Sequence, residues 1–167
     1  MIDEPSFEAF YRQTAAPLRA YVVRVLGHAA AAEDIVQDAY LRLLRAPPPI
    51  RDPGELRAYL FRIASNLIHD AWRRQRRERD AFDRDASAPG TATPNPGLRL
   101  DMARVFEQLR PEQRQLMWLA YVEGAEHREI AAALGLREGS VRVLLHRARR
   151  RLAALLGPRK TDSGERR

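Results

Sequence analysis

One segment constrains the fold of this chain most: Asp80 to Gly97, DAFDRDASAPGTATPNPG. It has almost no large apolar side chains that a core could bury. Its proline, glycine, alanine, serine and threonine are typical of a flexible linker. We therefore expect a flexible linker over residues 80–97 with a separate domain on each side. A chain of 167 residues suits two small domains of about 80 and about 60 residues, each near the lower size limit for independent stability.

The N-terminal segment shows helical periodicity only, with apolar residues recurring every three to four positions. Pro17 is expected to kink or split the first helix, and Leu44 to lie on the buried face of the second. The third helix is expected to have Asp52 as its N-cap, Pro53 as its first residue and Glu55 as its third. The expected helices lie over residues 6–26, 30–45 and 53–79, and the first domain over 1–79. We find no strand pattern and no internal repeat, which predicts an all-α fold of two small helical domains.

The C-terminal segment predicts a helix-turn-helix within a second domain, residues 98–157. A short amphipathic helix from His127 is stopped by Gly135, and a longer helix follows from Gly139 to Leu156. On a helical wheel, one face of this last helix is apolar and the opposite face is basic. Such a basic helix after a tight turn suits the major groove of DNA. Residues 158–167, PRKTDSGERR, are expected to form a disordered tail.

The charge of the chain favours a polyanionic partner. The formal net charge is +7, and the positive charge is almost wholly arginine, since Lys160 is the only lysine. The absence of cysteine excludes disulfides, thiolate metal sites and cysteine nucleophiles. The N-terminus lacks an apolar signal region, and no apolar run approaches about 18 residues, so we expect no membrane insertion and a cytoplasmic protein.

The sequence shows no pattern typical of a catalytic, metal or cofactor site. His127 and His146 have no second ligand four residues further along their helices, so no metal site is expected. The acidic residues scatter over helix exteriors instead of forming a carboxylate cluster beside a nucleophile. This disfavours a nucleic-acid enzyme such as a recombinase, and no catalytic residue or cofactor is predicted.

Two blocks of motifs resemble one bacterial family. The first block is EDIVQDAYLRLLR, Glu33–Arg45, followed by LRAYLFRIASNLIHDAWRR, Leu56–Arg74. The second is LRPEQR, Leu109–Arg114, followed by EGAEHREIAAALGL and GSVRVLLHRAR. Together they resemble the extracytoplasmic-function (ECF) sigma factors of the sigma-70 family, which keep only sigma regions 2 and 4, joined by a linker. The resemblance covers nearly the whole chain, and two ordered blocks are far more specific than a lone helix-turn-helix.

The resemblance implies contact with core RNA polymerase. In the family the polar side of the second helix docks on the β′ clamp helices, and region 4 contacts the β flap. This implies polymerase-binding roles for Asp34, Gln37, Asp38 and Arg42. Periodicity alone would favour a solvated helix face with incidental charges at these positions.

The resemblance also implies contacts with the minus-ten promoter element in region 2. The residues concerned are Ile50 and Arg51 in the loop before the third helix, and Asn66, His69, Asp70 and Arg73 on that helix. An amide and an apolar surface suit unstacked bases, which Asn66 and Ile50 can offer. Asp70 stands where an amide is common in the family, and a carboxylate repels DNA unless it accepts a hydrogen bond from a cytosine amine.

In region 4 the resemblance implies that the last helix reads the minus-thirty-five element. This assigns Arg142, Val143, His146 and Arg147 to base edges or nearby phosphates, and Arg149 and Arg150 to the backbone. Val143 can offer only an apolar contact, for instance to a thymine methyl. Arg137 replaces the serine, threonine or proline that often starts this helix, which predicts a weak cap.

The function implied is that of a promoter-specificity subunit. Such a protein binds core RNA polymerase, directs it to specific promoter DNA and helps melt the minus-ten region, without catalysis of its own. The family also implies an anti-sigma factor as a further partner. The alternative from the residues alone is an autonomous helix-turn-helix regulator whose N-terminal domain senses a ligand or dimerises.

Overall fold

The computed structural model describes residues 3–82 and 98–157. Within them every regular element is an α-helix, which confirms the all-α prediction. The helices are α1 (Glu4–Leu26), α2 (Ala29–Arg45), α3 (Pro53–Phe82), α4 (Leu98–Glu107), α5 (Pro111–Tyr121), α6 (His127–Leu134) and α7 (Glu138–Leu156). Most of the predicted linker, residues 83–97, and the predicted tail, residues 158–167, lie outside the described residues.

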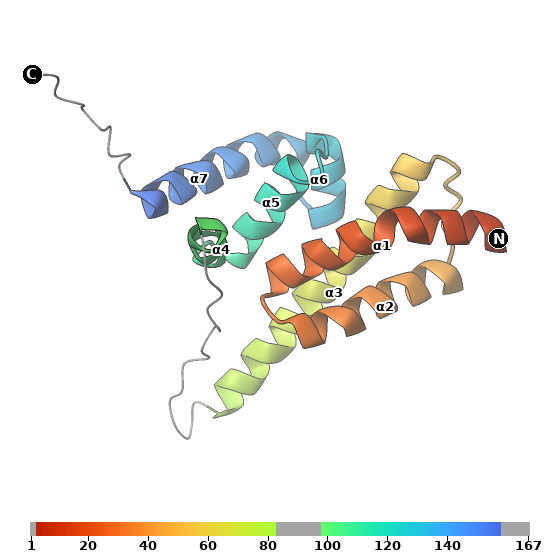
Figure 1. Ribbon diagram of the computed structural model, residues 1–167, viewed down its shortest axis with the longest axis horizontal. Coiled ribbons are helices and arrows are strands. Elements are labelled where there is room, and N and C mark those ends of the chain that lie inside the picture. Colours follow the sequence, from red (N-terminus) through yellow and green to blue (C-terminus); the bar gives the residue numbers. More distant parts are fainter. Residues whose placement is uncertain (1–2, 83–97, 158–167) are drawn as a thin grey trace, which may run out of the picture.

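Helices α1, α2 and α3 form the first group, with α2 packed against both of the others (Figure 1). Their apolar stripes meet in a core built around Leu18, Tyr21, Leu43, Leu60 and Ile68, each of which is essentially inaccessible to solvent. The start of α3 is as predicted, because the Glu55 amide donates to Asp52 Oδ2 at 2.8 Å. This cap fixes where the loop from α2 enters α3.

Three details of this group differ from the sequence-based expectation. Pro17 lies inside α1, which continues unbroken for 23 residues, since the missing hydrogen bond is outweighed by packing on both sides of it. Leu44 is exposed, because α2 turns Leu43 into the core and neighbouring positions diverge by about 100°. Helix α3 runs to Phe82, three residues beyond its expected end at residue 79.

Helices α4 to α7 form the second group. Leu116, Leu119, Ile130, Val141 and Leu145 make its core, with α7 packed across α5 and α6. Gly135 ends α6 with φ of +65°, a left-handed conformation that residues with a side chain rarely adopt. The chain then enters α7 after two residues, so α6 and α7 form the predicted helix-turn-helix.

The two groups pack against each other. Helix α6 lies against α3, and α5 lies against α1, so the second group covers one side of the first (Figure 1). Nothing in the local periodicity predicts this docking. Among the described helices, none is long and apolar enough to cross a membrane.

Candidate nucleic-acid interface

Helix α2 presents the predicted polymerase-binding residues to solvent. Asp34, Gln37, Asp38 and Arg42 are all exposed, and they lie on the side of α2 opposite its buried apolar stripe. The helix is fixed to α1 by that stripe and, at the surface, by an ion pair between Arg19 and Glu33. The structure therefore holds these four side chains on one rigid, outward-facing surface.

Two leucines on the same surface were missed by the sequence analysis as functional candidates. Leu41 and Leu44 are each 45% exposed, although α2 has a well-filled core face. They continue the exposed side of the helix, since positions 34, 37, 38, 41 and 44 recur at helical spacing. Exposed leucines beside polar residues are typical of a protein-binding surface. The adjacent pair Leu43–Leu44 signals this in the sequence, because only one of the two can face the core.

The predicted minus-ten residues lie around the start and middle of α3. Arg51, Asn66, Asp70 and Arg73 are exposed, and Ile50 is half-buried in the preceding loop. Asn66 lines a cavity of about 360 Å³ between the end of α2 and α3. The same cavity is lined by the half-buried ring of Tyr59. An amide and an aromatic ring thus share one recess.

Asp70 is less repulsive toward an anion than an isolated carboxylate would be. Its Oδ1 lies 3.8 Å from Arg73 Nη1, one helical turn further along α3. Both side chains are at least half exposed, so the pair is loose and free to rearrange around a ligand. The opposite charges nevertheless leave this part of α3 close to neutral before the arginine-rich end of the helix.

His69 differs from the other predicted minus-ten residues. It is half-buried, its ring lies 5.5 Å from that of Trp72, and its Nε2 lies 2.9 Å from Gln115 Oε1. Gln115 belongs to α5, so the ring faces the second domain rather than open solvent. The sequence could not reveal this, because the contact joins residues 46 positions apart.

Helix α7 places all six predicted minus-thirty-five residues on its exposed side, while Val141, Leu145 and Ala148 fill the core. Val143 is 50% exposed, which is unusual for valine and leaves its methyl groups free for an apolar contact. Arg137 is the N-cap of α7 and makes no side-chain capping hydrogen bond, as the sequence predicted. The exposed residues are Arg142, Val143, His146, Arg147, Arg149 and Arg150.

The structure brings two of the predicted sites together. One cavity of about 380 Å³ between α3, α5 and α7 is lined by both His69 and Arg147. His69 is expected at the minus-ten element, and Arg147 at the minus-thirty-five element. In the part of the chain that the structure describes, no three histidine, aspartate or glutamate side chains gather as metal ligands would.

Gln115 is a residue that the sequence analysis missed altogether. It is 1% exposed, and its side chain bonds to both α1 and α3 of the first domain, through Tyr21 and His69. Burial raises the pKa of the Tyr21 phenol well above its usual value, while its hydrogen bonds to Ser65 and Gln115 oppose the shift. The phenol is therefore a neutral, hydrogen-bonding group at this interface.

The fold defines a class: an all-α protein in which a DNA-binding helix-turn-helix domain is joined to a second helical domain. Comparison with protein families makes the assignment specific. Residues 10–78 match sigma-70 region 2, and residues 99–152 match sigma-70 region 4. The chain belongs to the ECF group of the sigma-70 family of RNA polymerase sigma factors.

Curated relatives and solved structures agree with this assignment. The RNA polymerase sigma factor CarQ of Myxococcus xanthus is 30% identical over 92% of this chain and 91% of its own. The ECF RNA polymerase sigma factor SigL of Mycobacterium tuberculosis is 38% identical over 89% of this chain and 87% of its own. Both alignments span the two domains, which favours a sigma factor over an autonomous regulator with an unrelated sensory domain.

Two solved structures share the fold. Sigma factor RpoE of Bartonella quintana, solved with the anti-sigma factor NepR, is 25% identical and has a TM-score of 0.76 over 90% of this chain and 96% of its own. CnrH, solved with the cytosolic domain of CnrY, is 27% identical and has a TM-score of 0.66 over 92% of this chain and 89% of its own. The protein is thus a transcription initiation factor that binds core RNA polymerase and directs it to promoters.

Proposed function

We propose that the exposed side of α2 is the surface that docks on the clamp helices of the polymerase β′ subunit. The observation that supports this most directly is the row of Asp34, Gln37 and Asp38 continued by exposed Leu41 and Leu44. Arg42 borders the same row and extends its polar rim. Exposed apolar side chains bordered by polar and charged ones are typical of a specific protein interface.

A charge reversal in this row tests the proposal. Asp38→Arg is expected to weaken binding to core RNA polymerase about tenfold, which corresponds to about 1.4 kcal/mol. The matched control is Glu8→Arg, the same reversal at an exposed position of α1 whose ion pair with Arg12 is solvated. Equal affinity of both variants for the core enzyme, measured by titration of labelled protein, would contradict the assignment of α2.

We further propose that the promoter is read at two places. The loop residues Ile50 and Arg51 and the α3 residues Asn66, His69, Asp70 and Arg73 contact the minus-ten element. The exposed side of α7, from Arg142 to Arg150, contacts the minus-thirty-five element. The recess lined by Asn66 and Tyr59 supports the first assignment, because an unstacked base needs an amide and an apolar surface.

The protein acts without catalysis of its own, in the cytoplasm, where polymerase and chromosomal DNA meet. Run-off transcription tests this as a whole: a promoter fragment should yield transcript only when core polymerase and this protein are both present. Transcription by the core enzyme alone from that promoter would contradict the proposal. Tight binding of the free protein to a palindromic duplex would instead favour an autonomous regulator.

On polymerase, the proposed contact of the second domain is the β flap.

An anti-sigma factor completes the proposed set of partners. The support for this partner is that the solved relative RpoE was obtained in complex with an anti-sigma factor. A tagged chain purified from its own host should carry a protein that lowers run-off transcription when added back in excess. A bound protein that leaves transcription unchanged would remove this partner from the proposal.

A further inference from the structure

Helix α2 carries charges that are separated by sign along its length. Asp34 and Asp38 lie in its N-terminal half, and Arg42 and Arg45 lie in its C-terminal half. All four side chains are exposed, and none of them forms an ion pair with another residue that the structure describes. The exposed side of α2 therefore has an acidic end and a basic end, and both can attract opposite charges of a partner.

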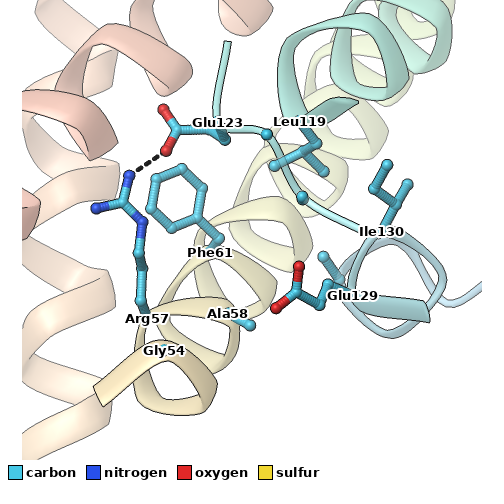
Figure 2. Close-up of a pocket in the computed structure, with 11 residues that line it drawn as sticks. Gly54, Arg57, Ala58, Phe61, Leu119, Glu123, Glu129 and Ile130 are labelled. Atoms are coloured by element: carbon cyan, nitrogen blue, oxygen red, sulfur yellow. Dashed lines mark hydrogen bonds and ion pairs between the residues drawn. The ribbon is translucent and has the colours of Figure 1, made fainter. Parts of the chain in front are cut away.

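Two other helix contacts show how this chain matches charges where its helices pack. Arg19 of α1 forms an ion pair with Glu33 at the start of α2. Arg57 of α3 forms an ion pair with Glu123, just after α5, and its guanidinium lies over the Phe61 ring at 5.3 Å (Figure 2). In both places an opposite charge lies across the contact. The charges on the exposed side of α2 have no such match within the described part of the chain.

Apolar side chains lie beside these charges. Leu41 and Leu44 are each 45% exposed, and Tyr11 of the neighbouring helix α1 is 42% exposed. The Tyr11 ring lies 4.8 Å from that of Tyr40, which precedes Leu44 by one helical turn, so all of them share one surface. Tyr40 is held by a hydrogen bond of 2.7 Å between its hydroxyl and Thr14 Oγ1, which fixes the shape of this surface. We call Tyr11, Leu41, Leu44 and the four charged residues the α2 patch.

The α2 patch is complementary to itself. If a second copy of the chain packs antiparallel along α2 about a two-fold axis, Asp38 of each copy faces Arg42 of the other, and the acidic and basic ends match. The midpoint of the four charges falls close to residue 40, and Leu41 lies about 2 Å from it along the helix. The two Leu41 side chains therefore meet near the axis. A parallel copy would place like charges side by side, so the charges select the antiparallel arrangement.

We propose that the free chain forms a two-fold symmetric dimer through antiparallel pairing of the α2 patch. One helix and one flanking tyrosine bury less than the roughly 1,200 Å² of a stable complex, so the dimer is weak, with a dissociation constant on the order of 10 μM. The dimer covers the row of residues proposed to dock on polymerase, so dimerisation and polymerase binding exclude one another. This consequence rests on the proposed function of α2, whereas the dimer itself does not.

Exchange of charges across the two-fold axis tests the dimer. Sedimentation equilibrium of the full chain should show a monomer–dimer equilibrium for the wild type. Asp38→Arg alone and Arg42→Asp alone should each weaken dimerisation at least about tenfold, because each variant places like charges across the axis. An equimolar mixture of the two variants should dimerise as the wild type does, because each contact between positions 38 and 42 then joins opposite charges. Mixing could not repair a variant whose α2 had unfolded.

The matched controls make the same two charge changes on α1. Glu8→Arg and Arg12→Asp alter exposed residues that are four positions apart, as residues 38 and 42 are, and that lie outside the α2 patch. Each should dimerise like the wild type, and mixing them should change nothing. A wild-type chain that stays monomeric at concentrations well above the expected dissociation constant would overturn the dimer. A mixture of Asp38→Arg and Arg42→Asp that stays as monomeric as its components would overturn it equally.

Titration of the same proteins with core polymerase reports separately on the proposed function of α2. Stoichiometric core enzyme should convert the wild-type dimer into a complex that holds one copy of this chain. If the wild type dimerises but Asp38→Arg binds core polymerase with wild-type affinity, the dimer stands and docking of α2 on the clamp helices fails. If the wild type stays monomeric while Asp38→Arg loses polymerase affinity, the docking stands, the dimer is overturned, and polymerase is the partner that the charges of α2 serve.

Discussion

Tyr21 illustrates how one hydroxyl group contributes to two levels of structure. Its ring fills the core of the first domain, and its oxygen lies within hydrogen-bonding distance of Ser65 and Gln115. A buried hydroxyl stabilises only while its partners are in place, and its partners are equally dependent on it. The residue therefore couples packing inside the first domain to docking of the second.

Tyr21→Phe is expected to lower the free energy of unfolding by about 1–2 kcal/mol at neutral pH, because Ser65 loses a donor and Gln115 an acceptor. The pH dependence should change as well. Burial raises the folded-state pKa of Tyr21, so its contribution is fully present below the unfolded-state value of about 10 and is lost as the pH rises above it. Urea titrations at several pH values measure both effects.

The control for this prediction is Tyr121→Phe, which alters a tyrosine that is more than half exposed. That variant should match the wild type both in neutral stability and in the slope of stability against pH above about pH 10. If Tyr21→Phe and the wild type lose stability equally steeply in alkali, the phenol is not held neutral by its burial.

Arg147 offers the sharpest residue-scale test of promoter reading. Arg147→Ala in the holoenzyme should weaken binding to a promoter fragment by about 1–3 kcal/mol if the guanidinium contacts a base edge. A phosphate contact would instead lower the salt dependence of binding by about one unit of slope. Arg151→Ala, at an exposed position of the same helix outside the assigned set, is the control. Equal binding by the two variants would remove Arg147 from the DNA surface.

At the scale of elements, local sequence signals were reliable where the controlling contact is itself local. The cap at Asp52 spans three residues, and the left-handed Gly135 ends α6 where its position indicates. Pro17 and Leu44 show the limit of the same reasoning. Whether a helix tolerates a proline, or which of two adjacent leucines turns inward, depends on neighbouring helices that periodicity does not describe.

The N-terminus of α7 lacks a favourable capping residue, and a substitution there can stabilise the helix. Arg137 occupies the N-cap without a capping hydrogen bond, so a side chain that can accept one from the first turn should stabilise the helix. Arg137→Ser is expected to raise the stability of the protein by about 0.5–1 kcal/mol. Thermal unfolding followed by circular dichroism measures this.

Arg137→Ala separates capping from the loss of a positive charge, since alanine removes the guanidinium but provides no acceptor. It should be no more stable than the wild type. Equal stabilisation by serine and alanine would mean that removing charge at the helix start, where the dipole disfavours cations, is the actual cause.

At the scale of the molecule, the position of one domain on the other could not be predicted. Each domain's surfaces followed from helical periodicity and from the family resemblance, and the structure exposes most of the assigned side chains. Gln115 reads as an ordinary polar helix residue in the sequence, yet it bonds to Tyr21, 94 positions away. No local pattern encodes such a partner, so both the docking and the sequestered place of His69 become visible only in three dimensions.

The proposed reading of the promoter at two separate sites predicts that the two domains act independently on a promoter. In the holoenzyme, Asn66→Ala and Arg142→Ala should each weaken promoter binding, and their free-energy effects should add within about 0.3–0.5 kcal/mol, because the residues would then lie far apart without shared partners. Titrations of a promoter fragment with the two single variants and the double variant measure this sum. The matched cycle pairs Arg142→Ala with Arg147→Ala, neighbours on one helix face, for which departure from additivity is expected. A coupling energy above about 1 kcal/mol between Asn66 and Arg142 would mean that the domains remain in contact on DNA, and that recognition of the two elements is not separable.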